Sequence, residues 1–385
     1  MQLTGKNVKV IVLCAVLMVA MAGLLAAEGQ PESVGAGAQY VGTETCGGCH
    51  EATYATFMKS GHAWKLNKVV GGQPPDYPYT ELPELPKGYT WSDISYVIGG
   101  YNWKARFVDQ RGYIITGAEG DTSYLSQYNF ANPVVGKEAG WVKYHPGEKR
   151  AYTCGSCHTT GYVPSDEHQD DLPGLIGTWA EPGIRCEECH GPGSAHAAQP
   201  LRVKMTIDRD SELCARCHIR GNPESVNASG GFVKHHEQYE ELFQSKHIVL
   251  NCVTCHDPHA GVIQLRKESK PTSRTQCASC HFKEAKYQAS PIMVAMDVQC
   301  IDCHMPRVTK SAWGDASKFT GDIRTHLMAI DAEQIVQFSE DGKTALSQLG
   351  LNFACRSCHV EGGSASALTD AALMQSAYNY HARPE

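Results

Sequence analysis

The sequence predicts a protein of mainly short α-helices and loops, with one small β insertion near residues 89–117. Three observations lead to this prediction. A five-residue motif, Cys-x-x-Cys-His, occurs eight times. Six copies crowd into residues 154–304, where each step leaves room for a short helix and a loop. By contrast, the 103 residues between His50 and Cys154 hold no copy, and 89–117 are rich in β-branched and aromatic residues.

The first 27 residues are typical of a secretory signal peptide. An apolar run at 8–27 follows Lys6 and Lys9 and ends in small residues. A retained membrane anchor is the alternative, whereas a lipoprotein is disfavoured because Leu13, not a small residue, precedes Cys14. No other apolar run is long enough to span a bilayer. We therefore expect an exported protein, periplasmic or extracellular at the cell surface, that meets membranes through partners.

Removal of this leader leaves sixteen cysteines, and all of them belong to the motif. The pairs are Cys46/Cys49, Cys154/Cys157, Cys186/Cys189, Cys214/Cys217, Cys252/Cys255, Cys277/Cys280, Cys300/Cys303 and Cys355/Cys358. The histidines that follow them are His50, His158, His190, His218, His256, His281, His304 and His359.

Disulfides, zinc knuckles and a thioredoxin-like redox motif are the competing interpretations of such pairs. None of them requires one spacing eight times with an obligatory histidine. With 18 histidines in 385 residues, eight of eight would arise by chance with a probability on the order of 10⁻¹¹. Cys-x-x-Cys-His is the attachment signature of c-type haem. The sequence therefore predicts eight covalently attached c-type haems.

The chemistry of attachment explains the spacing. Two thiols add to the two vinyl groups of one haem, and the adjacent histidine binds the iron from one face. The predicted fold class is a multihaem cytochrome c, in which short α-helices and loops wrap around a haem stack. The haems supply much of the buried apolar area, so a hydrophobic content of 42% is sufficient.

The charge balance excludes some partners. The formal charge is −7 and becomes −9 when Lys6 and Lys9 leave with the leader, and about two propionates per haem add to it. Nucleic acid and anionic membrane surfaces are therefore not expected partners. The expected partners are redox proteins or an extracellular electron acceptor.

The motif positions suggest a division of the chain. The expected segments are a signal peptide (1–27), a first haem segment (28–70), a haem-free insertion (71–150), a six-haem core (151–305) and a C-terminal segment with the eighth haem (306–385). In the insertion, "KARFV" and "GYIIT" flank "DQR" and predict a β-hairpin. Residues 71–88 are proline-rich and predict an irregular linker. The acidic run at 164–174 favours a solvated loop over a calcium site.

Helices are expected beside the motifs. Residues 51–61 should be helical up to Gly61, and 234–247 contain no helix breaker. Residues 369–381 begin with a Thr/Asp cap.

Ten histidines lie outside the motifs, and eight haems need at most eight further ligands. His168 lies in the acidic loop, and the adjacent His235 and His236 point in different directions on a helix, so that both do not reach iron. His145, His196, His259, His326 and His381 remain as candidate ligands. His259 follows His256 by three residues, so we expect it to bind the iron of a neighbouring haem, the alternative being a hydrogen bond to a propionate. His381 could close its own haem pocket or reach a second molecule in a homo-oligomer or filament.

A family resemblance appears at these positions. "ETCGGCHEATYATFMKSGHA" (44–63) resembles the opening of multihaem cytochromes related to the tetrahaem cytochrome of ammonia oxidisers, which implies that His62 is a haem ligand. "HEQYEELFQSKH" (236–247) is similar to a stretch of the pentahaem nitrite reductases, which implies that His236 and His247 bind iron and favours His236 over His235. "CIDCHMP" (300–306) also resembles that superfamily. Membership implies haems stacked in parallel and perpendicular pairs.

The sequence also departs from those families. The nitrite reductases carry one Cys-x-x-Cys-Lys at the catalytic haem, and here every pair ends in His. Hydroxylamine oxidoreductases carry eight His motifs but are longer and crosslink a tyrosine to the active haem. None of the 17 tyrosines can be assigned that role from the sequence.

Two functions follow. If all eight irons have two histidine ligands, no position is open for a substrate, and His/His ligation gives low potentials. This favours an electron-transfer protein of periplasmic or extracellular respiration, with the first and eighth haems as ports near opposite ends. The alternative is an oxidoreductase that acts on a small nitrogen or sulfur compound at one haem with an open axial position.

Overall fold

The computed structural model describes residues 37–82 and 84–382 of the chain. The predicted signal peptide, with Cys14, lies outside the described residues. None of the described helices has both the length and the apolar character needed to cross a membrane.

The helices are short, as expected for a chain with closely spaced attachment motifs. The α-helices are α2 (Thr43–Gly47), α3 (Glu51–Phe57), α4 (Gly155–His158), α5 (Cys186–His190), α6 (Ser194–Ala198), α7 (Ser211–Ala215), α8 (Gln238–Phe243), α9 (Cys252–Cys255), α10 (Val262–Lys267), α11 (Ala285–Gln288), α12 (Pro291–Ala295), α13 (Cys300–His304), α14 (Leu351–Ala354) and α15 (Asp370–Ala377). Single 3₁₀ turns are η1 (Trp91–Asp93), η2 (Gln169–Asp171), η3 (Lys246–Val249), η4 (Cys277–Ser279), η5 (Ala316–Lys318) and η6 (Tyr380–Ala382).

The strands form two larger sheets and one short pair. They are β1 (Leu66–Lys68), β2 (Ile94–Gly99), β3 (Lys104–Asp109), β4 (Tyr113–Ile114), β5 (Gln127–Asn129), β6 (Gly140–Val142), β7 (Arg150–Ala151), β8 (Thr159–Thr160), β9 (Glu181–Pro182), β10 (Val226–Ser229), β11 (Phe232–Lys234), β12 (Thr309–Asp315), β13 (Thr320–Ile323) and β14 (Thr344–Ala345). The short pair is β8 with β9.

The first sheet contains the β insertion that the sequence predicts. β3 and β4 pair antiparallel with Val108 opposite Ile114, which is the predicted hairpin. The sheet extends beyond it, in the order β1-β2-β3-β4-β7 with β5 and β6 attached to β3. Alternation along β2 buries both faces: Tyr96 and Ile98 pack in one cluster with Trp179, and Val97 packs in another with Phe107.

A second, five-stranded sheet was not predicted from the sequence. Its order is β13-β12-β11-β10-β14, so strands from 226–234 pair with strands from 309–345. Phe232, Val233 and Val308 form its core together with Leu327, Leu349 and Phe353 from the C-terminal segment. The sheet therefore joins the segment between the fourth and fifth motifs to the segment between the seventh and eighth.

The predicted helices form, but all three are shorter than expected, since α15 also ends at Ala377 and not at His381. α3 ends at Phe57, and a turn follows to Gly61. In 234–247, the first residues belong to β11 and to a turn in which His236 has φ 75°, so α8 begins at Gln238. α15 begins after Thr369, whose side chain accepts a hydrogen bond from Ala372 N as the cap predicts. The linker at 71–88 is irregular, as expected.

Buried carboxylates hold distant motif segments together. Glu187, which lies inside the third motif and is 2% exposed, accepts hydrogen bonds from Val41 N, Gly42 N and Gly193 N at 2.7–3.0 Å. Glu181 accepts two more from Thr43. These charge-assisted bonds fix α2, with the first motif, against α5, with the third.

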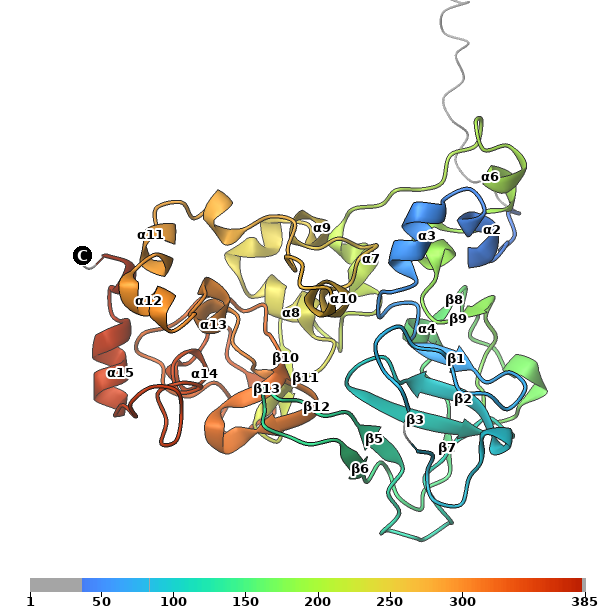
Figure 1. The fold of residues 1–385 in the computed structure, drawn as a ribbon, viewed down its shortest axis with the longest axis horizontal. Helices are drawn as coiled ribbons and strands as arrows, with labels where there is room; N and C mark the ends of the chain where they lie inside the picture. Colours follow the sequence, from blue (N-terminus) through green and yellow to red (C-terminus); the bar gives the residue numbers. More distant parts are fainter. Residues whose placement is uncertain (1–36, 83, 383–385) are drawn as a thin grey trace, which may run out of the picture.

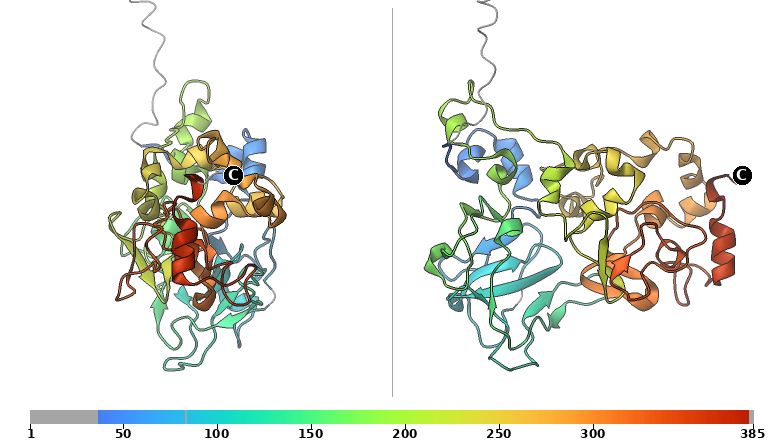
Figure 2. Two further views of the ribbon diagram at one scale, coloured as in Figure 1. Left: turned by 90° about the vertical axis from the view of Figure 1, so that its left-hand side faces the viewer. Right: turned by 180° about the vertical axis from the view of Figure 1, so that it is seen from behind.

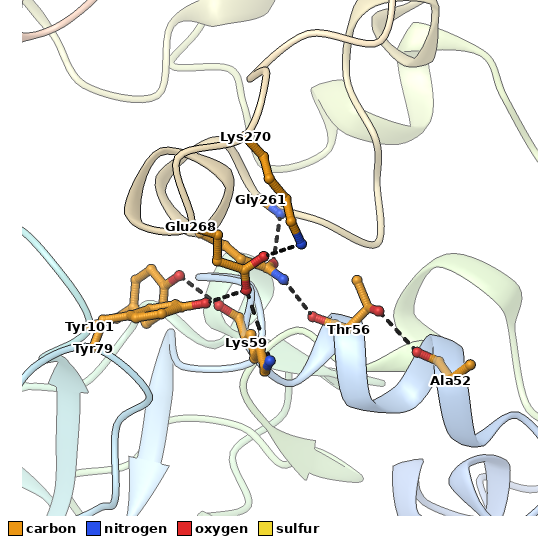
Figure 3. Close-up of polar contacts among 9 residues, drawn as sticks. Ala52, Thr56, Lys59, Tyr79, Tyr101, Gly261, Glu268 and Lys270 are labelled. Atoms are coloured by element: carbon orange, nitrogen blue, oxygen red, sulfur yellow. Dashed lines mark hydrogen bonds and ion pairs between the residues drawn. The ribbon is translucent and has the colours of Figure 1, made fainter.

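A polar cluster fixes α10 against the first haem segment (Figure 3). Glu268 accepts hydrogen bonds from Tyr79 Oη (2.7 Å) and Lys270 Nζ (2.6 Å), and Lys59 Nζ lies 4.0 Å away. Gln264 Nε2 donates to Thr56 O at 3.1 Å. The proline-rich linker, through Tyr79, therefore meets α3 and α10 at this cluster.

The chain runs from one end of an elongated molecule to the other (Figure 1). α2 and α3 lie above the first sheet at one end, α7, α8 and α9 lie in the middle, and α14 and α15 lie at the other end. The view from behind shows the same order (Figure 2). The first and eighth motifs are thus far apart, as the port hypothesis requires.

Candidate haem-binding sites

Each attachment motif is presented by a short helical turn. α5 and α13 span whole motifs, α4 and α9 span most of one, and η4 begins the sixth. Residues i and i+3 lie on the same side of a helical turn, so both thiols of a pair point the same way. All sixteen described cysteines are free of disulfides. In the described part of the chain, no three His, Cys, Asp or Glu side chains gather into a site for a bare metal ion.

The motif cysteines differ in exposure. Five are exposed, and the other eleven, Cys358 among them, are half-buried; the exposed ones are Cys49, Cys154, Cys189, Cys277 and Cys280. In the first, sixth and eighth motifs, the backbone N–H of Cys49, Cys280 and Cys358 donates to the carbonyl of the first cysteine of the pair at 3.1–3.2 Å, so the turn holds each pair together. The sequence predicts one role for all sixteen cysteines, and haem attachment stays a prediction at each of them.

Six motif histidines have another imidazole facing them at nearly the same distance. The ring centroids are 6.2 Å apart for His50–His196, 6.2 Å for His190–His259, 6.1 Å for His256–His326, 5.8 Å for His281–His247, 5.8 Å for His304–His381 and 6.2 Å for His218–His62. Two imidazole–metal bonds of about 2 Å each, plus the distance from each nitrogen to its ring centre, give a separation of this size. The gaps therefore fit one iron between each pair of rings.

His218 has two imidazole neighbours. His62 lies at 6.2 Å and His236 at 6.0 Å, with interplanar angles of 80° and 74°. Burial lowers the pKa of His62 to about 3 and that of His236 well below its usual range. Both rings are neutral at pH 7, which is the form that binds a metal. Either ring can serve as the second ligand at this site.

Hydrogen bonds fix the tautomer of several of these rings. His190 Nδ1 lies 2.7 Å from Thr206 O, His196 Nδ1 lies 2.7 Å from Val203 O, and His304 Nδ1 lies 2.9 Å from Met328 O. Donation from Nδ1 leaves Nε2 free to bind iron. A cavity of about 460 Å³ borders His190 and Cys189, with Ser156 of the second motif on its wall.

Among the described residues, no imidazole faces His158 or His359 at the 5.8–6.2 Å of the other sites. His235 and His236 lie near enough to His158 for their charges to interact with it. His359 Nδ1 lies 2.9 Å from Ser366 O in the segment between α14 and α15. Burial lowers the pKa of His158 to about 3, with Lys65 and Arg106 as further causes. The eight-for-eight pairing expected from the histidine count is therefore not what the structure arranges.

Cations gather beside the second motif. Lys104 and Arg106 point to the same side of β3, and Arg220 Nε bonds His235 O at 3.0 Å. Burial, followed by the charge of Arg106, lowers the pKa of Lys104 to about 7. Burial, followed by the charges of Lys104 and Arg220, lowers the pKa of His235 to about 2. This cluster was not predicted from the sequence, although the alternating Lys104 and Arg106 on a predicted strand place two cations on one side of it.

Two other histidines lie apart from the pairs. His145, a candidate ligand by count, is 39% exposed at its side chain, pairs with Glu148 at 3.2 Å and contacts Tyr144. His168 is exposed, and its Nδ1 lies 2.9 Å from Leu175 O. The structure brings neither ring against a motif histidine.

The motif cysteines follow one another through the molecule. The thiols of Cys46 and Cys186, of Cys157 and Cys217, and of Cys214 and Cys252 lie in hydrogen-bonding contact. Further along, Cys255 neighbours Cys277 and Cys280, Cys277 neighbours Cys300, and Cys303 neighbours Cys355 and Cys358. Cys189 neighbours both Cys214 and Cys217. The eight motifs thus form a connected series with the fourth at a junction.

Comparisons with known proteins point to one class. The family model described as cytochrome c554 and c-prime matches residues 126–191, which include the second and third motifs. Dissimilatory sulfite reductase MccA of Wolinella succinogenes is 22% identical over 402 residues, covering 77% of this chain and 55% of the relative. Multiheme cytochrome MtrA of Shewanella baltica is 27% identical over 172 residues, covering 41% of this chain and 46% of the relative. The chain therefore matches about half the length of these curated relatives.

Solved structures of similar fold cover more of the chain. Outer cell wall cytochrome OcwA matches 87% of this chain and 86% of its own, with 20% identity and a TM-score of 0.52. Octaheme sulfite reductase MccA matches 85% of this chain and 66% of its own, with 19% identity and a TM-score of 0.55. At these identities the likeness concerns the fold. Taken with the short-helix architecture, it shows that this chain has the multihaem cytochrome fold, and the repeated motif and the facing histidines are those of multihaem c-type cytochromes.

Proposed function

We propose that this protein carries electrons along eight covalently attached haems, one at each motif, as an exported cytochrome of periplasmic or extracellular respiration. The observation that carries this proposal is the set of six facing histidine pairs at 5.8–6.2 Å, all held in one connected series of motifs. A haem bound by two histidines transfers single electrons but offers no position to a substrate. Without a methionine ligand its potential is low.

The ends of the series support the assignment of ports. The first motif adjoins α2, and the eighth follows α14 at the opposite end (Figure 1). Electrons would enter from a redox partner at one end and leave to a second protein or an extracellular acceptor at the other. The formal charge of −7 favours partners or acceptors with a positive contact surface.

Two measurements on the mature, full-length protein test this proposal. Mass spectrometry should give eight haem additions and no free thiol, including at the exposed Cys49 and Cys280 and at Cys358. Electron paramagnetic resonance of the oxidised protein should give low-spin signals for six haems, and a redox titration should place them at low potentials. Six or fewer haems, or a mostly high-spin spectrum, would contradict the proposed electron-transfer function.

A second function is favoured by the surroundings of His158. We infer that the haem attached at Cys154 and Cys157 reduces a small oxyanion of nitrogen or sulfur, with electrons supplied through the fourth motif. No described imidazole pairs with His158 at the 5.8–6.2 Å of the other sites, and Lys65, Arg106 and Arg220 lie close enough to lower its pKa. Three cations attract an anion.

Titration of the oxidised protein with sulfite and with nitrite tests this second function. We expect one high-spin signal to change on addition of the anion, and the reduced protein to be reoxidised by it. An unchanged spectrum and no reoxidation would contradict this second function, and electron transfer would remain as the proposed function.

A further inference from the structure

The fourth motif holds its histidine differently from the others. Backbone carbonyls accept from Nδ1 of His190, His304 and His359. His218 Nδ1 instead lies 2.9 Å from the side-chain oxygen of Gln238. Among the motif histidines with a described Nδ1 contact, His218 therefore differs in having a side chain as its partner. A substitution can change that partner without moving the backbone.

Gln238 is fixed in place by the helix that it begins. Tyr239 N donates to His218 O at 3.1 Å, so two consecutive residues of α8 bond the same histidine. The buried Glu240 accepts hydrogen bonds from Arg220 N and Gly221 N, which extends the attachment beyond the motif. The amide oxygen of Gln238 therefore has little freedom to leave the ring.

The fourth motif is also the junction of the series. Cys217 contacts Cys157 of the second motif, and Cys214 contacts Cys252 of the fifth. Cys189 of the third motif neighbours both. An electron that arrives from the third haem therefore passes the fourth before it reaches either the second or the fifth.

We propose that Gln238 is a positioning residue that sets the potential of the haem at Cys214–His218 and thereby governs how electrons divide at the junction. The proposal rests on the electron-transfer function proposed above. A stronger acceptor at Nδ1 makes the imidazole more basic and stabilises the oxidised iron, and a missing acceptor does the reverse. Each electron that this iron gains comes from a neighbouring haem. The potential of this haem therefore sets the equilibrium of electron transfer toward the second haem and toward the fifth.

The test compares three variants of the full-length protein in a redox titration followed by electron paramagnetic resonance. Gln238→Glu should lower the potential of one low-spin haem by a roughly tenfold shift in its reduction equilibrium, about 59 mV for one electron. Gln238→Met should raise the potential of the same haem. Gln244→Glu is the matched control, because Gln244 caps α8 and its side chain bonds Pro223 O, not a histidine.

The outcomes separate the possible explanations. Equal shifts in Gln238→Glu and Gln244→Glu would show an effect of charge alone and overturn the proposal, as would no shift in either Gln238 variant. Loss of the haem in both Gln238 variants, seen by mass spectrometry, would show a merely structural role and also overturn it. A failure of the conductor itself would appear separately, as haems of the unaltered protein that do not exchange electrons during reductive stopped flow.

Discussion

His158 and His359 share one property and differ in another. Neither faces an imidazole in the described structure, whereas six other motif histidines do. His158 lies beside Lys65, Arg106 and Arg220, next to the junction of the series. His359 is half-buried between α14 and α15 at the end of the molecule (Figure 1), and Glu361 and Arg356 are close to it in sequence.

This difference indicates two uses for an open iron position. A site lined by three cations selects its ligand by charge, and its place at the junction supplies it with electrons from several haems. A site at the end of the series, with no such cluster, suits electron exchange with a partner at the surface. The following predictions test whether the two sites differ as proposed.

The largest expected effect concerns anion binding near His158. Arg106→Gln removes a cation that is half-buried against Tyr144, where its guanidinium carbon lies 3.5 Å from the ring centre. Loss of one charged hydrogen bond should weaken sulfite or nitrite binding about tenfold to a hundredfold. Spectroscopic titration of the oxidised protein measures it. Arg111→Gln, at an exposed arginine paired with Asp109, should leave the affinity unchanged; equal losses in both variants would contradict a specific site.

The second prediction turns a paired site into an unpaired one. His326 faces His256 at 6.1 Å, and the buried Glu241 accepts a hydrogen bond from His326 N. His326→Ala should convert one haem from low to high spin, because the protein then supplies one ligand to that iron. The readout is the electron paramagnetic resonance spectrum. His145→Ala, which removes an exposed histidine of similar standing in the sequence, should change nothing; a spin change there would instead restore His145 as a ligand.

Much of this arrangement could be predicted because it is local in sequence. The motif spacing alone indicates haem attachment, and "KARFV" and "GYIIT" on either side of "DQR" predict a hairpin that the structure confirms. The second sheet could not be predicted, because its strands span two to seven residues and two of its four pairings join distant segments, Val233 with Thr309 and Val226 with Ala345. Its stability comes from tertiary contacts such as Phe232 with Phe353, which no local pattern reports.

The histidine pairs show the same limit. Counting indicated that His259 and His196 belong to neighbouring haems, but the partner of each depends on how distant segments meet. His196 faces His50 because Glu187 ties the start of the chain to α5. Counting also favoured His145, yet this residue lies in a turn with φ 45° and pairs with Glu148. A number of ligands that matches the number of haems does not imply that each haem receives one.

The third prediction concerns the C-terminal histidine. His381 faces His304 of the same chain at 5.8 Å with an interplanar angle of 19°. Truncation after Tyr380 should therefore convert one haem to high spin in the monomer, at any protein concentration. This favours closure of a pocket within the chain over a ligand donated to a second molecule. If the truncated protein showed the spin change only under conditions in which the full-length protein forms filaments, a ligand donated by a second molecule would be the better explanation.

The smallest effect is expected from the polar cluster at Glu268. Hydrogen bonds from Lys270 and Tyr79 lower the pKa of Glu268 to about 2, below the ~4.3 of an unfolded glutamate. The folded state therefore gains stability from this carboxylate above about pH 4.3 and loses it as the pH falls toward 2. Because the cluster lies near the surface, Glu268→Gln should lower Tm by about 1–3 °C at pH 7. The difference from the unaltered protein should shrink steadily between pH 4.3 and 2 in thermal melts. Glu84→Gln, which changes the same type of residue at an exposed position in the linker, should show no such pH dependence. A constant difference at all pH values would mean that Glu268 acts through packing and not through its charge.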